Sequence, residues 1–536
     1  MKKLKLVCVA IAMAGAAPTF AGGLLTNTNQ HVAFNRMMSR EASIGIDGVY
    51  YNPAGVVFMG EGHHLAINWQ LAYQTRTINN DYKLFTNNVN NPITPRDFKG
   101  KAFAPVIPSF QYAYNKGKWS FQANFSLTGG GGKCTFDDGL GSFEKIVSET
   151  AIAACGLAGV VDQTLGNKLG QPGMEMFTSD QAFGKTGKYS FNSYMHGRQY
   201  YYGLSAGAAY KFCDNFSAFL GVRGVYALTN YYGYVENINV GNMPLYKVLD
   251  PTKENAANIE LSCDQTGVGF TPIIGVDYKT DRWNFSAKYE FKTRIRLKNK
   301  SVNQTPSIGN LPANLANQMT GILTARYQQA GLPLEQAKQQ AENTTNAVLN
   351  DPTVGATMMG LKTQFDQKLN KAIGEYEDGK KIAGDIPGYL ALGIGYSPVD
   401  AVRVNVGFHW FDDKNATSYN NRNKELKRGT LEYNAGVEVD VNKKITLSTG
   451  WQNTNYGLSD EYMDDKSFVV GSNSAAIGGV YHINKKMDLN VAYFHTFYQH
   501  KKTSETVQLA ADKSIVYNSD YTRNNNVFAV GLDINF

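Results

Sequence analysis

Hydrophobic and polar residues alternate with a period of two along much of this chain. In the C-terminal stretch from Val527 to Phe536, apolar residues alternate with small or polar ones. Because successive side chains of a strand point to opposite faces, this pattern predicts a strand with one apolar face. Similar runs predict about fourteen strands, near residues 63–77, 105–115, 118–128, 199–212, 216–235, 266–279, 283–297, 386–397, 402–414, 430–441, 444–456, 473–484, 487–500 and 523–536.

The connections between these strands are alternately short and long. Short turns are expected at residues 115–118, 213–215, 280–282, 397–401, 441–444 and 484–486. Longer connections are expected at 78–104, 129–198, 236–265, 298–385, 415–429, 457–472 and 501–522. Strict alternation places every short turn at the periplasmic end of a barrel and every long loop outside the cell. The predicted fold class is therefore all-β: an up-and-down antiparallel transmembrane β-barrel of about 14 strands.

Two of the long connections contain apolar residues at helical spacing. The positions are Phe143, Ile146, Val147, Ala151, Ala154 and Leu157, then Leu315, Met319, Ile322 and Leu323, then Met358, Leu361, Phe365 and Leu369. They predict amphipathic helices, so the extracellular loops are expected to be partly helical. These helices either pack on one another as a cap or leave an apolar groove open to a hydrophobic ligand.

The chain begins with the pattern of a secretory signal peptide. Met1 to Lys5 is basic, Leu6 to Ala17 is apolar, and small residues precede a cleavage site after Ala21. Residues 1–21 are therefore assigned to the signal peptide. Residues 22–62 show no alternation and are expected to form an N-terminal hatch in the lumen. Residues 63–536 are assigned to the transmembrane β-barrel.

Composition excludes several classes of protein. The net charge of +7 is modest for 536 residues, and no basic block carries interleaved aromatics, so no nucleic-acid partner is expected. Mean hydropathy is −0.33, and no later run approaches the roughly 20 apolar residues of a membrane-spanning helix. The cysteines lack metal or redox spacing, so no metal or cofactor is expected. Cys213 and Cys263 should lie at opposite barrel ends and stay unbonded, whereas Cys134 and Cys155 share an outer loop and are free to pair.

Two short motifs in the N-terminal segment carry a family resemblance. They are Ser39-Arg40-Glu41-Ala42-Ser43 and Tyr51-Asn52-Pro53-Ala54-Gly55. Together with the strand pattern and the helical loops, they resemble the FadL/TodX family of outer-membrane transporters for long-chain fatty acids and other hydrophobic compounds. The resemblance implies a monomeric barrel in the bacterial outer membrane whose lumen is blocked by the hatch. It implies capture of hydrophobic small molecules at the outer loops, hatch-gated passage, and lateral release into outer-membrane lipid through a gap at a kinked strand. The glycines at 129–132 are candidates for flexibility there.

The sequence also indicates residues for the gate and for a ligand. Asn52 and Pro53 could lock the exit of the hatch, because Pro fixes φ and Asn bonds to nearby backbone; Ala54 completes the family's Asn-Pro-Ala motif. An ordinary turn is the alternative. A carboxylate needs a cation or hydrogen-bond donors, and strand parity directs five cationic candidates into the lumen. They are Arg223, Lys288, Lys292, Arg403 and His409; each could equally belong to a polar wall network.

The sequence is also compatible with two other transport functions. A non-specific outer-membrane porin would need an open lumen, and an aromatic-hydrocarbon channel would use the same architecture. An enzyme is not expected, because none of the histidines near the strands sits in a recognised catalytic signature. The terminal strand ending in Phe536 resembles the assembly signal of bacterial barrels, so the barrel assembly machinery is an expected partner.

Overall fold

The computed structural model describes residues 24–306, 308–510 and 513–536, and the signal peptide assigned to residues 1–21 lies outside them. Within the described residues, fourteen antiparallel spans form a closed barrel. Closure comes from the pairing of the first strand with the last, from His64–Asn535 to Tyr82–Tyr517. The spans are β1 (Gly62–Tyr82), β2 (Arg96–Lys116), β3 (Trp119–Phe136), β4 (Tyr189–Lys211), β5 (Phe216–Val240), β7 (Ile259–Lys279), β8 with β9 (Trp283–Glu290, Arg296–Gln304), β10 with β11 (Lys381–Ala383, Tyr389–Val399), β12 (Val402–Phe411), β13 (Thr430–Asn442), β14 (Ile445–Asn455), β15 (Ser472–Asn484), β16 (Met487–Tyr498) and β18 (Lys513–Asn535).

The two faces of the strands differ as the alternation predicts. On β1, Ile67 and Trp69 are exposed on the outside, whereas Asn68 and Gln70 are buried in the lumen. On β18, Phe528 is exposed and its neighbour Val527 is buried. An exterior of apolar and aromatic side chains around a polar interior suits lipid outside and a polar lumen. The fold class predicted from the sequence is confirmed.

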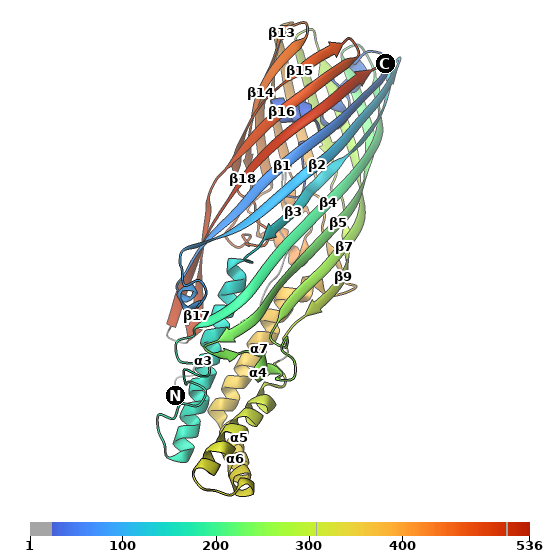
Figure 1. Cartoon of the computed structure of the whole chain (residues 1–536). Helices are drawn as coiled ribbons and strands as arrows, with labels where there is room; N and C mark the ends of the chain where they lie inside the picture. Colours follow the sequence, from blue (N-terminus) through green and yellow to red (C-terminus); the bar gives the residue numbers. More distant parts are fainter. Residues whose placement is uncertain (1–23, 307, 511–512) are drawn as a thin grey trace.

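Several strands are longer than their apolar pattern, all at the outer end (Figure 1). β3 does not end at residue 128 but continues through the glycine run to Phe136, and β4 begins at Tyr189 rather than near 199. The predicted loop at 501–522 contains a hairpin of β17 (Lys501–Ala510) and the start of β18. Beyond the lipid band a strand needs no apolar outer face, so its alternation disappears. The predicted single strand at 283–297 is also wrong, because pairing breaks between β8 and β9.

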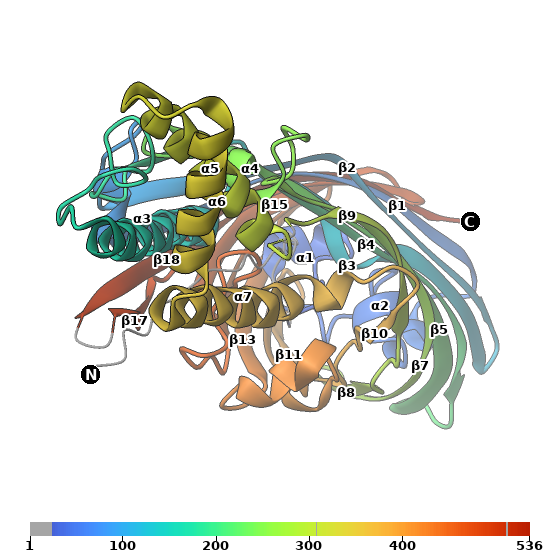
Figure 2. The same cartoon turned by 90° about the horizontal axis from the view of Figure 1, so that it is seen from below.

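Helices cover the outer end of the barrel (Figures 1 and 2). Three were expected: α3 (Gly141–Leu169), α5 (Leu311–Gln329) and α7 (Pro352–Ile373). α6 (Leu334–Leu349) was not, because its buried face consists largely of alanine and threonine. On α5, Leu315, Met319 and Leu323 are buried, but the predicted core residue Ile322 is 45% exposed. By length and composition α3 could cross a membrane, yet half of its apolar window is buried in this cap. The remaining short elements are α4 (Tyr246–Leu249), β6 (Met243–Pro244), η2 (Lys83–Asn87), η3 (Gly374–Tyr376), η4 (Asp413–Asn415) and η5 (Tyr419–Glu425).

Candidate functional site

The N-terminal residues 24–61, here called the luminal segment, lie inside the barrel. The segment contains α1 (Val32–Met37), α2 (Gly48–Tyr51) and η1 (Gly55–Phe58), and Figure 2 shows both α-helices within the ring of strands. α1 contacts β13 to β16, β18 and β1, α2 contacts β2 and β3, and η1 contacts β3, β4, β5 and β7. Because it touches strands all around the ring, the segment occupies the cross-section of the lumen.

Local sequence fixes the course of α1. His31 is its N-cap, and the His31 imidazole accepts a hydrogen bond from the backbone N–H of Ala33. The helix ends at Met38, whose φ of 55° is left-handed. The Met37 carbonyl then lies against two glycines of the wall: a Cβ at Gly436 or Gly450 would approach its oxygen to 2.2 or 1.8 Å. The wall therefore needs glycine where the luminal segment touches it most closely.

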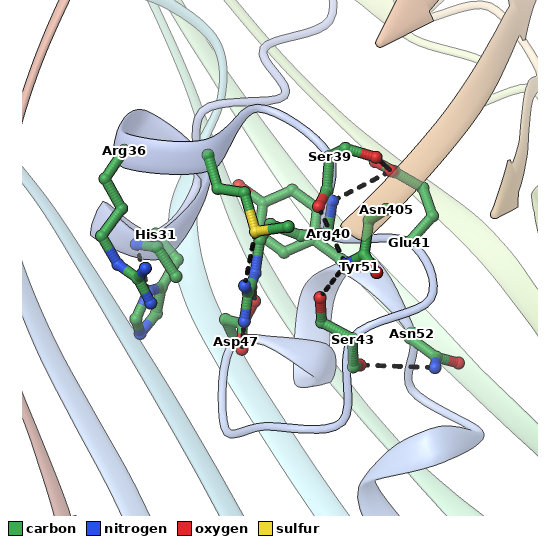
Figure 3. Close-up of polar contacts among 12 residues, drawn as sticks. His31, Arg36, Ser39, Arg40, Glu41, Ser43, Asp47, Tyr51, Asn52 and Asn405 are labelled. Carbon is green, nitrogen blue, oxygen red and sulfur yellow. Dashed lines mark hydrogen bonds and ion pairs between the residues drawn. The ribbon is translucent and has the colours of Figure 1, made fainter. Parts of the chain in front are cut away.

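Two arginines of the luminal segment converge on a single wall carboxylate. Glu438 on β13 forms ion pairs with Arg36 and Arg40, the latter at 2.9 Å. Arg40 also binds Asp47 through Nε at 2.7 Å (Figure 3). Burial raises the pKa of the Asp47 carboxyl, but Arg40 outweighs it and holds the net pKa below its usual value. Both arginines and Glu438 are buried. Ion pairs shielded from water therefore hold the luminal segment against β13.

A second cluster joins the segment to the wall through histidine. His409 Nε2 lies 2.8 Å from Glu41 of the luminal segment, and its Nδ1 lies 2.8 Å from Glu432 of β13. Thr454 and Gln452 each donate a hydrogen bond to the remaining oxygen of Glu432. His409, which the sequence indicated as a ligand candidate, is thus placed between two buried carboxylates.

The motif Asn52-Pro53-Ala54 touches the wall at each of its residues. The Asn52 amide donates to Asp277 at 2.5 Å. Gln122 donates to the Pro53 carbonyl, and Ser217 donates to the Ala54 carbonyl, both at 2.7 Å. Three strands therefore hold these three residues, which is the contact that a gate would have to break.

The four other predicted ligand cations also have carboxylate partners. Arg223 and Lys288 both bind Glu290, at 2.6 and 2.9 Å. Lys288 additionally donates to the Tyr50 carbonyl of the luminal segment. Lys292 lies 4.0 Å from Asp385, and Arg403 binds Asp440 at 2.6 Å. All five candidates of the sequence are thus neutralised by acids, which favours the wall-network alternative for them.

Two further arginines, which the sequence did not indicate, face each other where the first and last strands of the barrel pair. Arg76 of β1 and Arg523 of β18 are direct register partners and are 1% and 5% exposed. Both donate to Gln74 Oε1. The Arg76 Nη1 and Nη2 atoms have no hydrogen-bond partner in the part of the chain that the structure describes. Like charges directly opposite are destabilising, so this position is suited to an anion.

The luminal segment also covers an interruption in the wall. β2 and β3 are paired at Gly100–Ala102 and again at Phe110–Lys116, so residues 103–109 and 126–133 lie between two ladders. There the Asn27 backbone N–H and side-chain amide donate to the carbonyls of Thr128 and Gly130, at 2.9 and 2.7 Å. Gln30 donates to the Leu127 carbonyl at 2.9 Å. Residues of the lumen thus satisfy backbone groups that the neighbouring strand leaves free.

The cap encloses an apolar cavity at the outer end. Its volume is about 130 Å³, and nearly all of its lining is hydrophobic. α3 provides Ala154, Leu157 and Ala158, and the facing side includes Leu249 and Leu315. The helices predicted from periodicity therefore both pack as a cap and leave apolar space between them.

One buried acid of the outer loops contacts the first described residue of the luminal segment. Asp413, in the loop after β12, accepts from the backbone N–H groups of Thr430 and Leu24, at 2.9 and 3.2 Å. Burial raises its pKa to about 6, above the unfolded value of roughly 4. Folding therefore favours the protonated carboxyl. The stability from this preference is complete below about pH 4 and is lost as pH rises through 6, by up to about 3 kcal/mol.

We therefore expect Asp413→Asn to change the pH dependence of stability. Heat-induced unfolding, followed by the gel shift between folded and unfolded barrel, should show the variant gaining on wild type from pH 4 to 7.5. The amide keeps an acceptor for one of the two N–H groups and carries no charge. Parallel melting curves over this range would contradict the assignment.

Among known proteins, this chain is similar only in fold, to solved structures. No protein-family model and no curated protein sequence matches the chain. Among solved structures, a Pseudomonas aeruginosa FadL homologue has a TM-score of 0.56 at 13% identity, covering 96% of this chain and 100% of that one. A deltaS2S3 mutant of the monoaromatic hydrocarbon channel TodX has a TM-score of 0.50 at 13% identity, covering 94% and 98%.

The chain has the FadL/TodX fold. This agrees with the resemblance of the N-terminal motifs and with the luminal segment, the closed barrel and the helical outer loops. A FadL-like barrel with an apolar exterior belongs in a bacterial outer membrane.

Proposed function

We propose that this FadL-like barrel carries long-chain fatty acids across the outer membrane by passage past a luminal hatch and lateral release. The observation that carries the acid specificity is the Arg76–Arg523 pair. A buried guanidinium with free N–H groups beside a second positive charge suits a carboxylate, because charge-assisted hydrogen bonds to arginine are the strong ones. A neutral hydrocarbon would leave the Arg76 Nη1 and Nη2 groups without an acceptor in the described part of the chain.

The proposed route runs from the cap to the gap in the wall. The apolar cavity under α3 takes the tail of the ligand first. Arg76 lies six residues along β1 beyond Gln70, which contacts Asn29 of the luminal segment, and six residues of strand span about 20 Å. The carboxylate would therefore be held between the cap and the hatch. Withdrawal of Asn27 and Gln30 from β3 would then open the unpaired stretch between β2 and β3 toward lipid.

The TodX monoaromatic hydrocarbon channel, which has a similar fold, makes a neutral aromatic hydrocarbon the second candidate. The apolar cavity of the cap would serve either ligand, so it does not separate them. The paired arginines favour the acid. A non-specific porin is disfavoured by the luminal segment, which fills the cross-section.

Uptake by whole cells separates the three functions. Cells lacking their own fatty acid transporter should take up labelled oleate when they express this chain, with saturation. Toluene and a small hydrophilic solute of comparable mass serve as the other two probes. Uptake of toluene without oleate would replace the proposal by the hydrocarbon channel, and entry of the hydrophilic solute would replace it by the porin.

Filling the cavity of the cap should weaken capture. Ala154→Trp places an indole in the cavity, and we expect oleate uptake at limiting concentration to fall about tenfold while uptake at saturation changes less. Gly159→Trp is the matched control on the same helix, because a Cβ at Gly159 meets open space. Equal uptake by the two variants would show that the cavity takes no part in capture.

A further inference from the structure

Three basic residues form a patch on the outer surface of the barrel, here called the basic patch. Lys101 of β2 and Lys133 of β3 are exposed, and Arg198 of β4 is half-buried. The three strands are consecutive neighbours in the sheet and run side by side in Figure 1. All three residues stand on the face that looks away from the lumen, so the proposed transport path does not use them.

Aromatic residues on the same strands show where the basic patch lies relative to the lipid. On β2 the next outward residue from Lys101 toward the periplasmic end is Phe103, which is 54% exposed. On β4 the next outward residues from Arg198 in that direction are Tyr200 and Tyr202, whose rings stack with centroids 5.7 Å apart. Aromatic residues mark the interface of a membrane barrel. The basic patch is therefore the first polar layer above the apolar band, at the level of lipid head groups in the outer leaflet.

No ion pair joins the basic patch to a carboxylate of the described residues. Lys133 and Arg198 are direct register partners across β3 and β4, and Lys101 lies opposite Thr135 and so diagonal to Lys133. Like charges at such positions repel. None of the three has an ion pair with a carboxylate among residues 24–306, 308–510 and 513–536, and the buried Arg198 Nε has no hydrogen-bond partner there. A bound anion would relieve the repulsion between these three neighbouring cations.

We propose that the basic patch binds a phosphate group of lipid A, the phosphorylated disaccharide lipid of the outer leaflet. Phosphate offers several oxygens to an arginine fork and to lysine ammonium groups. The acyl chains of the same lipid would lie along the apolar band below, beside Phe103 and Tyr200. The site would hold the lipid next to the unpaired stretch of β2 and β3, outside the barrel.

Native mass spectrometry of the purified protein in detergent tests the site. The probes are bisphosphorylated lipid A and the same lipid without its phosphates. We expect the wild type to retain bound lipid A, and the triple variant Lys101→Gln, Lys133→Gln, Arg198→Gln to bind it at least tenfold more weakly. The phosphate-free lipid should bind the wild type no better than lipid A binds the triple variant.

A control removes three charges at the other end of the barrel. Lys443→Gln, Lys485→Gln, Lys486→Gln alters exposed lysines of periplasmic turns and should bind lipid A within twofold of wild type. Folding is verified by the gel shift of the unheated barrel, and if the triple variant fails it, the single Lys133→Gln should still lose about threefold. The proposal is overturned if the basic-patch variant keeps wild-type affinity, if the control loses as much, or if removal of the phosphates has no effect.

Discussion

Changing Glu438 to Ala should turn a nearly non-conducting barrel into one that conducts ions. The substitution removes the wall carboxylate with which Arg36 and Arg40 of the luminal segment both pair. Removing one partner of a buried ion pair costs about 3–5 kcal/mol, because the remaining charge stays desolvated. The equilibrium between seated and released segment should therefore shift by a factor on the order of 10² to 10⁴. Openings in a planar lipid bilayer should become that much more frequent.

Asp440→Ala is the matched control for this effect. Asp440 lies two residues along the same strand and pairs with Arg403, but no contact of its carboxylate reaches the luminal segment within the described part of the chain. It should leave the barrel as quiet as wild type. If both variants conduct alike, the loss reflects damage to β13, and the assignment of Glu438 as an anchor is wrong.

The second large effect is expected at Arg76. Arg76→Gln keeps a polar side chain of similar reach but removes the charge that no acid of the described chain neutralises. Oleate uptake at limiting concentration should fall at least tenfold, since hydrogen bonds from a charged donor contribute about 1.5–3 kcal/mol. Uptake of the methyl ester of oleate should not change, because the ester carries no charge.

Arg403→Gln controls for loss of any lumen-side cation. The sequence predicted Arg403 as a candidate for ligand binding, but its guanidinium already binds Asp440. The proposal expects near wild-type oleate uptake from this variant. The reverse result, with Arg403 sensitive and Arg76 silent, would return the head-group site to the residues that strand parity indicated.

The sequence predicts the barrel well because each residue of a spanning strand faces either lipid or the lumen, and that environment determines the polarity of its side chain. Alternation at Val527–Phe536 reports directly which side chains meet lipid, and the short turns report the periplasmic end. The pattern fails where those constraints end. The glycines at 129–132 have no side chain to alternate, so the continuation of β3 was hidden. β9 and the outer half of β4 stand above the lipid, where polar residues are tolerated on both faces.

The candidate site was predictable only in part. Parity correctly turns Arg223, Lys288 and His409 inward, and all three are buried. It cannot supply their partners, because Glu41 and His409 are 368 residues apart in sequence. Strand parity also could not single out Arg76, because what sets it apart is another arginine directly opposite on the strand paired with β1. Register between the first and last strands is a property of barrel closure and leaves no local signal.

The conductance of a barrel lacking residues 24–61 tests the central claim most directly. With residues 1–23 retained, the shortened protein should still insert, because the strands and the C-terminal residue are unchanged. In a planar bilayer it should conduct ions steadily where the full-length protein is nearly closed, and oleate uptake by cells should not improve. Equal conductance of the two proteins would contradict a luminal hatch and support the non-specific porin instead.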